Sequence, residues 1–458
     1  MVFGGDAARN ASVSASGPLL SDCWRVSTIE HPFVEAIVEQ IQLSHRDHDR
    51  WALPALQPLV VDNIVLMRTA RNLLAVDFTT GKRIWEVPGD DPFESLSESS
   101  IAAKAVEPMG GSRGGGFDLQ AALRYRLWGD ATFGTLASDG DRVFAIEDLS
   151  LDLGTSAARA MFMPNRRINA SDPKPFNRLA AYDVHSGKLL WHVGGPGDEA
   201  ALAQAGTFFL GAPLPVGGQV YAIGEQKGDL RLLVLNAKTG HVTWTQQLGA
   251  VDQDHDIAND PLRRISGVSP SFADGILVCP TSNRSVVALE PATRSLLWGY
   301  AYKATDQAQP RQAPMFFGMG NPTDPDPANR WARTSVLVAE GRVLITPVDS
   351  GELHCVSLID GKPLWRKPRE EDVCLACVDQ GKVVLLGRRG MRALKLADGE
   401  PAWSPVRSEM PAGAMPSGTG YRSGDRYYLP LASGEVAAVE LQSGKIVHGY
   451  QSRRGAVP

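Results

Sequence analysis

Apolar and polar residues alternate with a period of two in seven short stretches of the chain. A Gly, Asn or Asp turn opens each stretch, and a second turn and another apolar run follow it. The stretches read NIVLMR (63–68), DRVFAIE (141–147), QVYAIGE (219–225), GILVCPT (275–281), GRVLITP (341–347), GKVVLLG (381–387) and DRYYLPL (425–431). Because neighbouring side chains of a strand point to opposite faces, this pattern predicts β-strands joined by tight turns.

A second pattern follows each of these stretches: an apolar run, a polar residue, a short turn that usually contains Gly, and a final aromatic residue. The copies read AVDFTTGKRIW (75–85), AYDVHSGKLLW (181–191), VLNAKTGHVTW (234–244), ALEPATRSLLW (288–298), VSLIDGKPLW (356–365), ALKLADGEPAW (393–403) and AVELQSGKIVH (438–448). Their last positions, Trp85, Trp191, Trp244, Trp298, Trp365, Trp403 and His448, are 106, 53, 54, 67, 38 and 45 residues apart. Apart from the first, such periods are typical of four-stranded propeller blades with variable loops.

The repeated residue types have a structural explanation. We expect Gly, such as Gly81 in the first copy, where the turn needs a positive φ, and we expect the preceding polar residue to bond turn amides. Trp then packs on the fourth, outer strand. In the fourth copy Arg294 replaces Gly, so we expect a strained turn or another turn type there. A catalytic set is not needed seven times, so we interpret the motif as structural and assign no catalytic residue.

The skeleton resembles the tryptophan-docking repeat of the PQQ-like (quinoprotein) β-propellers over about residues 18–450. In overall sequence character it is closest to the non-catalytic bacterial PQQ-like repeat proteins. The resemblance implies an all-β fold of radially arranged, four-stranded antiparallel blades, commonly eight. Trp24 resembles an outer-strand Trp that lacks inner strands. We therefore expect one propeller domain over residues 1–458, with seven complete blades plus part of an eighth: either a seven-bladed ring with an extra strand at its seam, or a piece of an eight-bladed parent.

Long excursions interrupt the repeat at residues 88–130, 149–178, 249–266 and 300–333. Three of them join successive blades, and residues 149–178 join the second and third strands of one blade. In a propeller all these connections lie on one face, whereas the motif turns lie on the other. Loops on rigid scaffolds carry function, so we expect a binding site on this face and at the mouth of the central channel. Covering of blade edges is the alternative.

Composition narrows the function further. The net charge of −5, without a long run of one sign, does not favour nucleic-acid binding. No apolar stretch is long enough to span a bilayer, and the first residues do not resemble a signal peptide. The abrupt N-terminus suggests a processed or trimmed chain. The resemblance to secreted propellers implies a periplasmic or extracytoplasmic location, while the oligomeric state stays open.

Residues 248–264 contain a calcium-like spacing. Asp252, Asp254 and Asp256 alternate as the first ligands of a calcium loop do, but Ile257 and Arg263 stand where its Gly and bidentate Glu belong. We expect a solvated acidic loop and assign no metal ligand. His255 in the same loop has the chemistry of a general base but no assignable partner.

The cysteines lie at positions 23, 279, 355, 374 and 377, which is not a disulfide framework. Cys374 and Cys377 lack the second ligand pair of a zinc site. Because they lie three apart in a predicted strand, we expect buried cysteines that point to opposite faces.

The long excursions are rich in aromatic, Met and Arg residues, types enriched at protein interfaces. They are Arg124, Tyr125, Arg126, Trp128, Met161, Phe162, Met163, Arg166, Arg167, Met315, Phe316, Phe317, Met319 and Trp331. Packing of the loops onto the blades and binding of a partner both explain this composition.

Two functions follow. The sequence favours a non-catalytic scaffold or binding module for a protein or polysaccharide partner, without a cofactor. The alternative is a quinoprotein dehydrogenase with PQQ and Ca²⁺. The resemblance implies for such enzymes a disulfide between adjacent cysteines, a base Asp and a set of calcium ligands; no two cysteines are adjacent here, and no stretch matches the other motifs.

Overall fold

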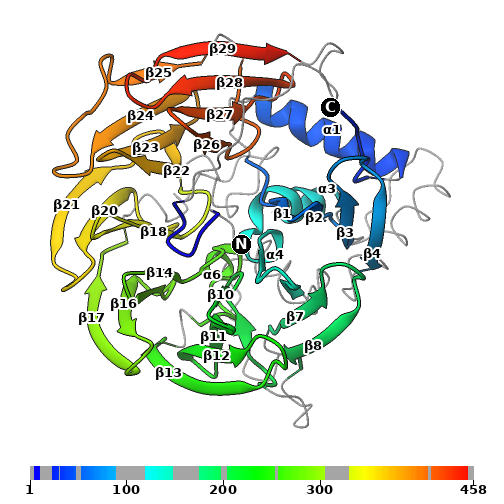
Figure 1. The fold of residues 1–458 in the computed structure, drawn as a ribbon, viewed down its shortest axis with the longest axis vertical. Coiled ribbons are helices and arrows are strands. Elements are labelled where there is room, and N and C mark those ends of the chain that lie inside the picture. Colours follow the sequence, from blue (N-terminus) through cyan, green and yellow to red (C-terminus); the bar gives the residue numbers. More distant parts are fainter. Residues whose placement is uncertain are drawn as a thin grey trace, which may run out of the picture.

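The computed structural model describes residues 5–10, 23–29, 31–47, 53–88, 119–147, 175–196, 204–252, 256–304, 330–410 and 414–451. Within them, seven antiparallel sheets surround a centre (Figure 1). We call them blades 1 to 7. Blades 1 to 3 are β1(Leu59–Val61) β2(Ile64–Arg68) β3(Asn72–Asp77) β4(Arg83–Pro88), β5(Leu136–Ser138) β6(Arg142–Glu147) β7(Arg178–Asp183) β8(Leu189–Gly194), and β10(Leu214–Val216) β11(Gln219–Gln226) β12(Asp229–Asn236) β13(Val242–Ala250).

The remaining blades have the same plan. Blades 4 and 5 are β14(Ser271–Ala273) β15(Ile276–Pro280) β16(Ser285–Glu290) β17(Ser295–Ala301) and β18(Ser335–Ala339) β19(Arg342–Thr346) β20(Glu352–Ser357) β21(Pro363–Pro368). Blades 6 and 7 are β22(Asp372–Asp379) β23(Lys382–Gly387) β24(Gly390–Lys395) β25(Arg407–Glu409) and β26(Tyr421–Ser423) β27(Arg426–Pro430) β28(Glu435–Glu440) β29(Ile446–Gln451). The seven complete blades of the expected β-propeller are thus confirmed, and the seven alternating stretches are the second strands.

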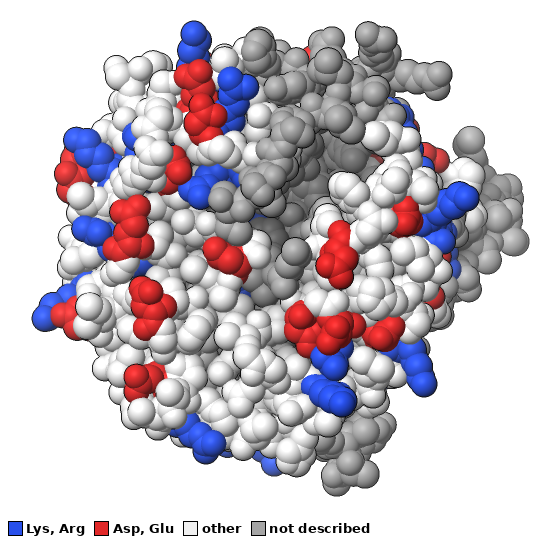
Figure 2. Space-filling model, in the orientation of Figure 1, with Lys and Arg blue, Asp and Glu red and all other residues white. Residues whose placement is uncertain are grey.

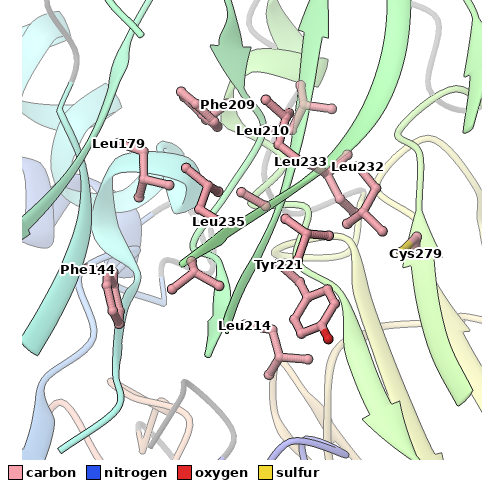
Figure 3. Close-up of a cluster of buried hydrophobic side chains, with 14 of the residues drawn as sticks. Phe144, Leu179, Phe209, Leu210, Leu214, Tyr221, Leu232, Leu233, Leu235 and Cys279 are labelled. Atoms are coloured by element: carbon pink, nitrogen blue, oxygen red, sulfur yellow. The ribbon is translucent and has the colours of Figure 1, made fainter. Parts of the chain in front are cut away.

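Blades stack on one another through apolar side chains, which form the core. The largest cluster gathers Phe144 and Leu179 of blade 2, Leu233 and Tyr221 of blade 3, and Cys279 of blade 4 (Figure 3). An extra strand, β9(Phe208–Phe209), pairs with β11 at this cluster. The sheets therefore bury both faces between neighbouring blades, as expected for a propeller.

Five of the six motif tryptophans hydrogen-bond the next blade. The indole N–H of Trp85 donates to the carbonyl of Val184 in blade 2 at 2.8 Å, and the Trp191 indole donates to Ala237 in blade 3 at 3.0 Å. The same bond joins Trp298 to Leu358, Trp365 to Leu396, and Trp403 to Leu441, at 2.8, 2.9 and 3.0 Å. These tryptophans therefore join neighbouring blades through indole hydrogen bonds.

The motif glycine is needed for two reasons. Gly187 has φ +69, and a Cβ atom there would lie 2.7 Å from the Trp85 ring. The polar residue before it bonds turn amides, since Asp183 accepts from the N–H of Ser186 at 2.8 Å. Hydrogen bonds from the Ser186 hydroxyl and backbone also lower the pKa of Asp183. Both sequence expectations for this turn are confirmed.

A bulge precedes the docking Trp. In blade 1, Ala75 pairs with Trp85 while Val76 pairs with Arg83, so Ile84 is the extra residue. Ile84 is consequently 44% exposed although it adjoins a packed indole. Leu190, Leu297 and Leu364 hold the same position and are exposed to a similar degree. In blade 6, Trp403 instead precedes β25, because the flanking Pro401 and Pro405 cannot donate ladder hydrogen bonds.

The described strands of each blade are consecutive in the chain, so no blade contains strands from both ends. Trp24 stands at the seam: its indole donates to the Phe78 carbonyl at 2.7 Å and packs on Gly81, as a docking Trp does. Residues 23–29 contain no strand, so within the described residues the eighth repeat contributes a docked Trp.

Helix α1(Pro32–Asp47) lies between blades 7 and 1 (Figure 1). Its buried Ile37, Val38 and Ile41 pack on Leu123 of α3(Leu119–Arg124). Leu53, just beyond the helix, packs into a cluster from blades 6 and 7. The gap between the first and last blades is therefore closed by side-chain packing.

Candidate functional site

The strand order defines two faces of the ring. We call the side of the blade-to-blade and second-to-third-strand connections the long-loop face, and the opposite side the short-turn face. The four excursions 88–130, 149–178, 249–266 and 300–333 all attach to the long-loop face, as expected. We describe this face as the candidate site, from the side chains that anchor its described parts.

The connection between blades 1 and 2 packs into the ring. It contains α3, the π-helix η1(Tyr125–Gly129) and α4(Ala131–Gly134), whose first turn is capped by the Asp130 carboxylate bonding the Phe133 N–H at 2.9 Å. The guanidinium carbons of Arg68 and Arg126 lie 4.2 and 3.9 Å from the Phe133 ring centre. Arg126 is fully buried. The cation–π contact of Arg68 thus fixes this loop to blade 1, and that of Arg126 joins two parts of the loop.

A buried ion pair anchors the connection between blades 3 and 4. Arg263 of α6(Pro261–Ile265) lies 2.6 Å from the Glu225 carboxylate at the end of β11, and both side chains are buried. The other carboxylate oxygen accepts from the Ile257 N–H at 2.9 Å. Arg264 donates to the Ile257 carbonyl at 2.6 Å. Because breaking such a pair leaves a buried charge unpaired, it holds residues 256–265 in one conformation.

Two further buried clusters lie at strand ends on the same face. In blade 2, the Glu147 carboxylate receives hydrogen bonds from Arg178 and the Tyr182 hydroxyl. In blade 6, Asp372 lies 2.6 Å from Arg392 and 2.9 Å from Arg407. Charged clusters in blades 2, 3 and 6 therefore stiffen the rim from which the long connections leave.

A buried Ser–His pair lies in blade 5. His354 Nε2 is 3.3 Å from the Ser350 hydroxyl, and Nδ1 is 3.0 Å from the Tyr300 hydroxyl of blade 4. Ser350 is 3% exposed and His354 is fully buried. Burial, together with the charge of Arg366, lowers the pKa of His354 to about 4. Both ring nitrogens are occupied by the chain's own groups, so we interpret the pair as structural. No local spacing in the sequence signals it.

Asp349 beside this pair is a carboxyl group with a raised pKa, as is Asp372 in blade 6. Burial raises its pKa, although the nearby Arg284 guanidinium opposes the shift, and the Tyr302 hydroxyl bonds the carboxyl. Its side chain retains partial exposure, at 21%. No local sequence pattern signals Asp349, because its raised pKa arises from the packing of residues in other strands.

The calcium-like loop is only partly described: Asp254 and His255 lie outside the described residues. Asp256 accepts from the N–H groups of Ala258 and Asn259 at 3.1 and 3.0 Å, so its carboxylate closes a turn. Across the described part of the chain, no three His, Cys, Asp or Glu side chains gather in an arrangement that could hold a metal ion.

Cys374 and Cys377 are both buried, and burial raises the pKa of each thiol to about 12. The expectation that they point to opposite faces is wrong: both pack in one cluster with Tyr427 and Trp403. Bulges between Asp372 and Cys374 and between Leu375 and Cys377 shift the register of β22 and cause this.

The loop aromatics that the structure describes pack inward. Trp331 is fully buried and donates to the Glu352 carbonyl at 3.1 Å. Trp128 packs on the α1–α3 cluster, edge-on to His45. Tyr125 is half-buried in η1. Residues Met161, Phe162, Met163, Arg166, Arg167, Met315, Phe316, Phe317 and Met319 lie outside the described residues.

The turns between second and third strands differ in charge from those between first and second strands. On the long-loop face, exposed Lys227, Arg284 and Arg389 lie at turns between second and third strands. On the short-turn face, turns between first and second strands carry Asp62, Asp141, Asp274, Glu340 and Asp425. Figure 2 shows one side of the ring, with several acidic side chains around its central hollow and most basic ones farther out.

Comparisons with known proteins place these features in context. The family model described as outer membrane protein assembly factor BamB matches residues 103–313 and 321–456. Among solved structures, BamB from Moraxella catarrhalis is similar at 13% identity and a TM-score of 0.49, over 84% of this chain and 83% of that one. A quinohemoprotein alcohol dehydrogenase from Pseudomonas putida HK5 is similar at 13% identity and a TM-score of 0.48, over 89% of this chain and 67% of that one.

No curated protein matches the chain at a significant level. In the part of the chain that the structure describes, no helix combines the length and apolar character needed to cross a bilayer.

Proposed function

Because this chain belongs to the PQQ-repeat β-propeller family of the outer membrane protein assembly factor BamB, we propose that it is a non-catalytic scaffold. It binds a protein or polysaccharide partner through the long-loop face and the channel mouth on that side. The observation that carries the proposal is the anchoring of this face by buried ion pairs, above all Arg263–Glu225 at 2.6 Å. A preformed surface loses less conformational entropy on binding than a flexible one.

The chemistry of the described groups supports binding over catalysis. His354 and Tyr302, whose pKa values are strongly shifted, are buried and engaged with other residues of the chain. Cys374 and Cys377 are likewise protonated and buried. Catalytic acids and bases need access to substrate as well as a shifted pKa. These groups instead stabilise the blades.

The charge of the turn tips favours an acidic partner. Lys227, Arg284 and Arg389 are exposed and belong to blades 3, 4 and 6, so they surround part of the same rim. Electrostatic complementarity steers association and selects partners more than it adds affinity. An acidic protein segment or an anionic polysaccharide fits this surface. A periplasmic or extracytoplasmic location is part of the proposal.

A charge-reversal experiment tests the face. The triple variant Lys227→Glu, Arg284→Glu, Arg389→Glu is compared with a matched control, Lys82→Glu, Lys188→Glu, Lys238→Glu, which reverses three exposed lysines of the motif turns on the short-turn face. Each immobilised protein is incubated with an envelope extract of the host, and bound proteins and sugars are quantified. We expect a partner retained by wild type and control and lost by the long-loop variant. Equal retention by all three proteins contradicts the proposal.

The quinoprotein alternative has a direct test. The intact protein is titrated with PQQ in the presence of Ca²⁺, and absorbance and dye-linked alcohol oxidation are measured. The scaffold proposal expects no saturable change and no oxidation. Stoichiometric PQQ binding with oxidation of an alcohol would overturn it.

A further inference from the structure

Residues 5–10 lie at the centre of the ring, beside strands that are far from them in the sequence (Figure 1). They contact the innermost strands of three blades. The Phe272 N–H of β14 donates to the Ala7 carbonyl at 2.8 Å, and the Val338 N–H of β18 donates to the Ala8 carbonyl at 3.0 Å. One short peptide thus accepts hydrogen bonds from two blade edges.

Asn10 extends this pairing to blade 6. Its side-chain oxygen accepts from the Val378 N–H at 2.7 Å, and its side-chain nitrogen donates to the Val378 carbonyl at 3.1 Å. The carboxamide therefore pairs with the edge of β22 as the backbone of a strand residue would. This two-bond pairing selects Asn, because a carboxylate lacks the donor and an aliphatic side chain lacks both groups.

The three bonded residues occupy equivalent positions. Phe272, Val338 and Val378 are each the second-last residue of an innermost strand, next to a turn of the short-turn face. In blade 3 that position is Pro215, which has no N–H to offer. The segment therefore lies across the edges of blades 4, 5 and 6, at the channel mouth opposite to the long-loop face.

Arg9 inserts into the channel below this mouth. Its Nε and Nη2 atoms both donate to the Pro270 carbonyl, at 3.1 and 3.0 Å, and the residue is 8% exposed. Arg9 has φ +62, and its N–H bonds the Asp6 carbonyl, so a tight turn directs the side chain inward. Asp6 also accepts from the Asn10 N–H at 2.9 Å. The segment is thus shaped as a turn with one buried cationic anchor.

The insertion of Arg9 is opposed by charge. Burial and the neighbouring Arg333 guanidinium lower the pKa of Arg9 to about 10. The hydrogen bonds to Ala7, Ala8 and Asn10 favour the docked state, whereas the burial of one arginine near another disfavours it. The Asp6 carboxylate counters only part of this opposition, so a competing segment can displace residues 5–10. Unpaired strand edges are recurrent docking sites for extended peptides.

We propose that the short-turn mouth of the channel, between β14, β18 and β22, is a peptide-binding site, which residues 5–10 occupy in cis. Its ligand in trans is a turn-forming segment of the form small–small–Arg–Asn. The small residues present backbone carbonyls to blades 4 and 5, Arg enters the channel, and Asn pairs with β22. The site is separate from the long-loop face and does not depend on its partner.

Fluorescence anisotropy with a defined probe tests this site. The probe is the acetylated, fluorescein-labelled peptide GGDAARNAS, which copies residues 4–12. The full chain is used as wild type and as the variant Arg9→Ala, Asn10→Ala, whose own segment has lost its anchors. We expect the variant to bind the probe at least about ten-fold more tightly, because the segment of the wild type competes for the site. A probe with the same two substitutions should lose at least about ten-fold in affinity.

A receptor variant provides the matched control. Val378→Pro is added to the variant Arg9→Ala, Asn10→Ala. It removes the channel-facing N–H of β22, which Pro215 lacks naturally in blade 3, and should abolish the gain in probe affinity. If the double variant binds the probe no more tightly than wild type while its circular dichroism is unchanged, the proposal is wrong. If the variant does not fold, the wild-type protein is titrated with the probe and with the substituted probe instead. Saturable binding of the probe, absent for the substituted probe, supports the site, and its absence overturns it. Substitution of Lys227, Arg284 and Arg389 should leave probe binding unchanged.

Discussion

The guanidinium carbon of Arg294 lies 5.4 Å from the ring centre of Trp244, at the junction of blades 3 and 4. Arg294 occupies the position of the motif glycine and has φ +59, close to the φ +69 of Gly187. The turn is therefore of the same type, and the strain expected from the sequence is present. A cation–π contact takes the place of the packing between a glycine and an indole.

Substitution of Arg294 should separate these two effects. Arg294→Ala keeps a Cβ in the left-handed region and removes the cation–π contact, so we expect a loss of ~0.5–1 kcal/mol in the free energy of unfolding. Arg294→Gly also loses the contact but relieves the backbone strain, so its stability should stay within ~0.5 kcal/mol of wild type. Urea unfolding followed by tryptophan fluorescence measures both. Equal losses in the two variants would show that strain contributes nothing.

Gly187→Ala should be far more damaging than either change at Arg294. A methyl group there would lie 2.7 Å from the Trp85 ring, and the φ of +69 disfavours a side chain. We expect a loss of ~2–4 kcal/mol from overpacking and strain together. Gly275→Ala is the control: it has φ +78 with no atom within 4 Å of the added carbon, so it reports strain alone. A loss at Gly187 no larger than at Gly275 would contradict the docking explanation.

Trp298→Ala should cost ~3–5 kcal/mol, because it opens a cavity between blades 4 and 5. Trp298→Phe keeps much of the packing but leaves the Leu358 carbonyl without its 2.8 Å donor, for which we expect a smaller loss of ~1–3 kcal/mol. Thermal and urea unfolding measure both variants. If Trp298→Phe were as stable as wild type, the indole hydrogen bond would carry none of the docking energy.

The thiols should differ sharply in reactivity. Burial raises the pKa of Cys355, Cys374 and Cys377 to about 12, and also raises that of Cys279. These thiols are therefore protonated and inaccessible at pH 8, whereas Cys23 is exposed. Ellman's reagent should titrate one thiol in the native protein and all five in guanidinium chloride. Rapid reaction of a second thiol without denaturant would disprove this burial.

The stability should fall below pH 6.5 through His354. Its pKa is about 4 in the folded protein against 6.5 in the unfolded chain, so the unfolded state binds the proton more readily. The stabilisation is present above pH 6.5 and is lost as the pH falls toward 4, by up to about 3 kcal/mol. His354→Gln should flatten this part of the pH profile of urea unfolding, while substitution of the exposed His241 should not. An unchanged profile in His354→Gln would assign the pH dependence to other groups.

Several details of the blades arise from pairing rather than from local pattern. Alternation along β22 predicts opposite faces for Cys374 and Cys377, but two bulges place both in one cluster. A bulge likewise exposes Ile84 beside the packed Trp85. Bulges depend on the strand opposite, so a single stretch of sequence does not report them.

Less of the candidate site than of the fold could be predicted from the sequence. Its position on the long-loop face followed from loop lengths and strand order. Its anchors could not be predicted from the sequence. Glu225 and Arg263 are 38 residues apart, and they form an ion pair only when blade 3 and the connection that follows it pack together. The Ser350–His354–Tyr300 network likewise joins two blades.

The sequence by itself determined the blade repeat, the seven docking motifs and the face on which the long connections lie, because each depends on residues a few positions apart and recurs down the chain. Only the tertiary structure decided what fills the seam and the channel. Helix α1 and Trp24 close the ring, and residues 5–10 reach strands more than 250 positions away, with Arg9 bonding Pro270 and Asn10 bonding Val378. Such contacts leave no local sequence pattern. They form because closure of the ring brings the unpaired edges of the innermost strands to one centre, where a segment distant in sequence bonds them.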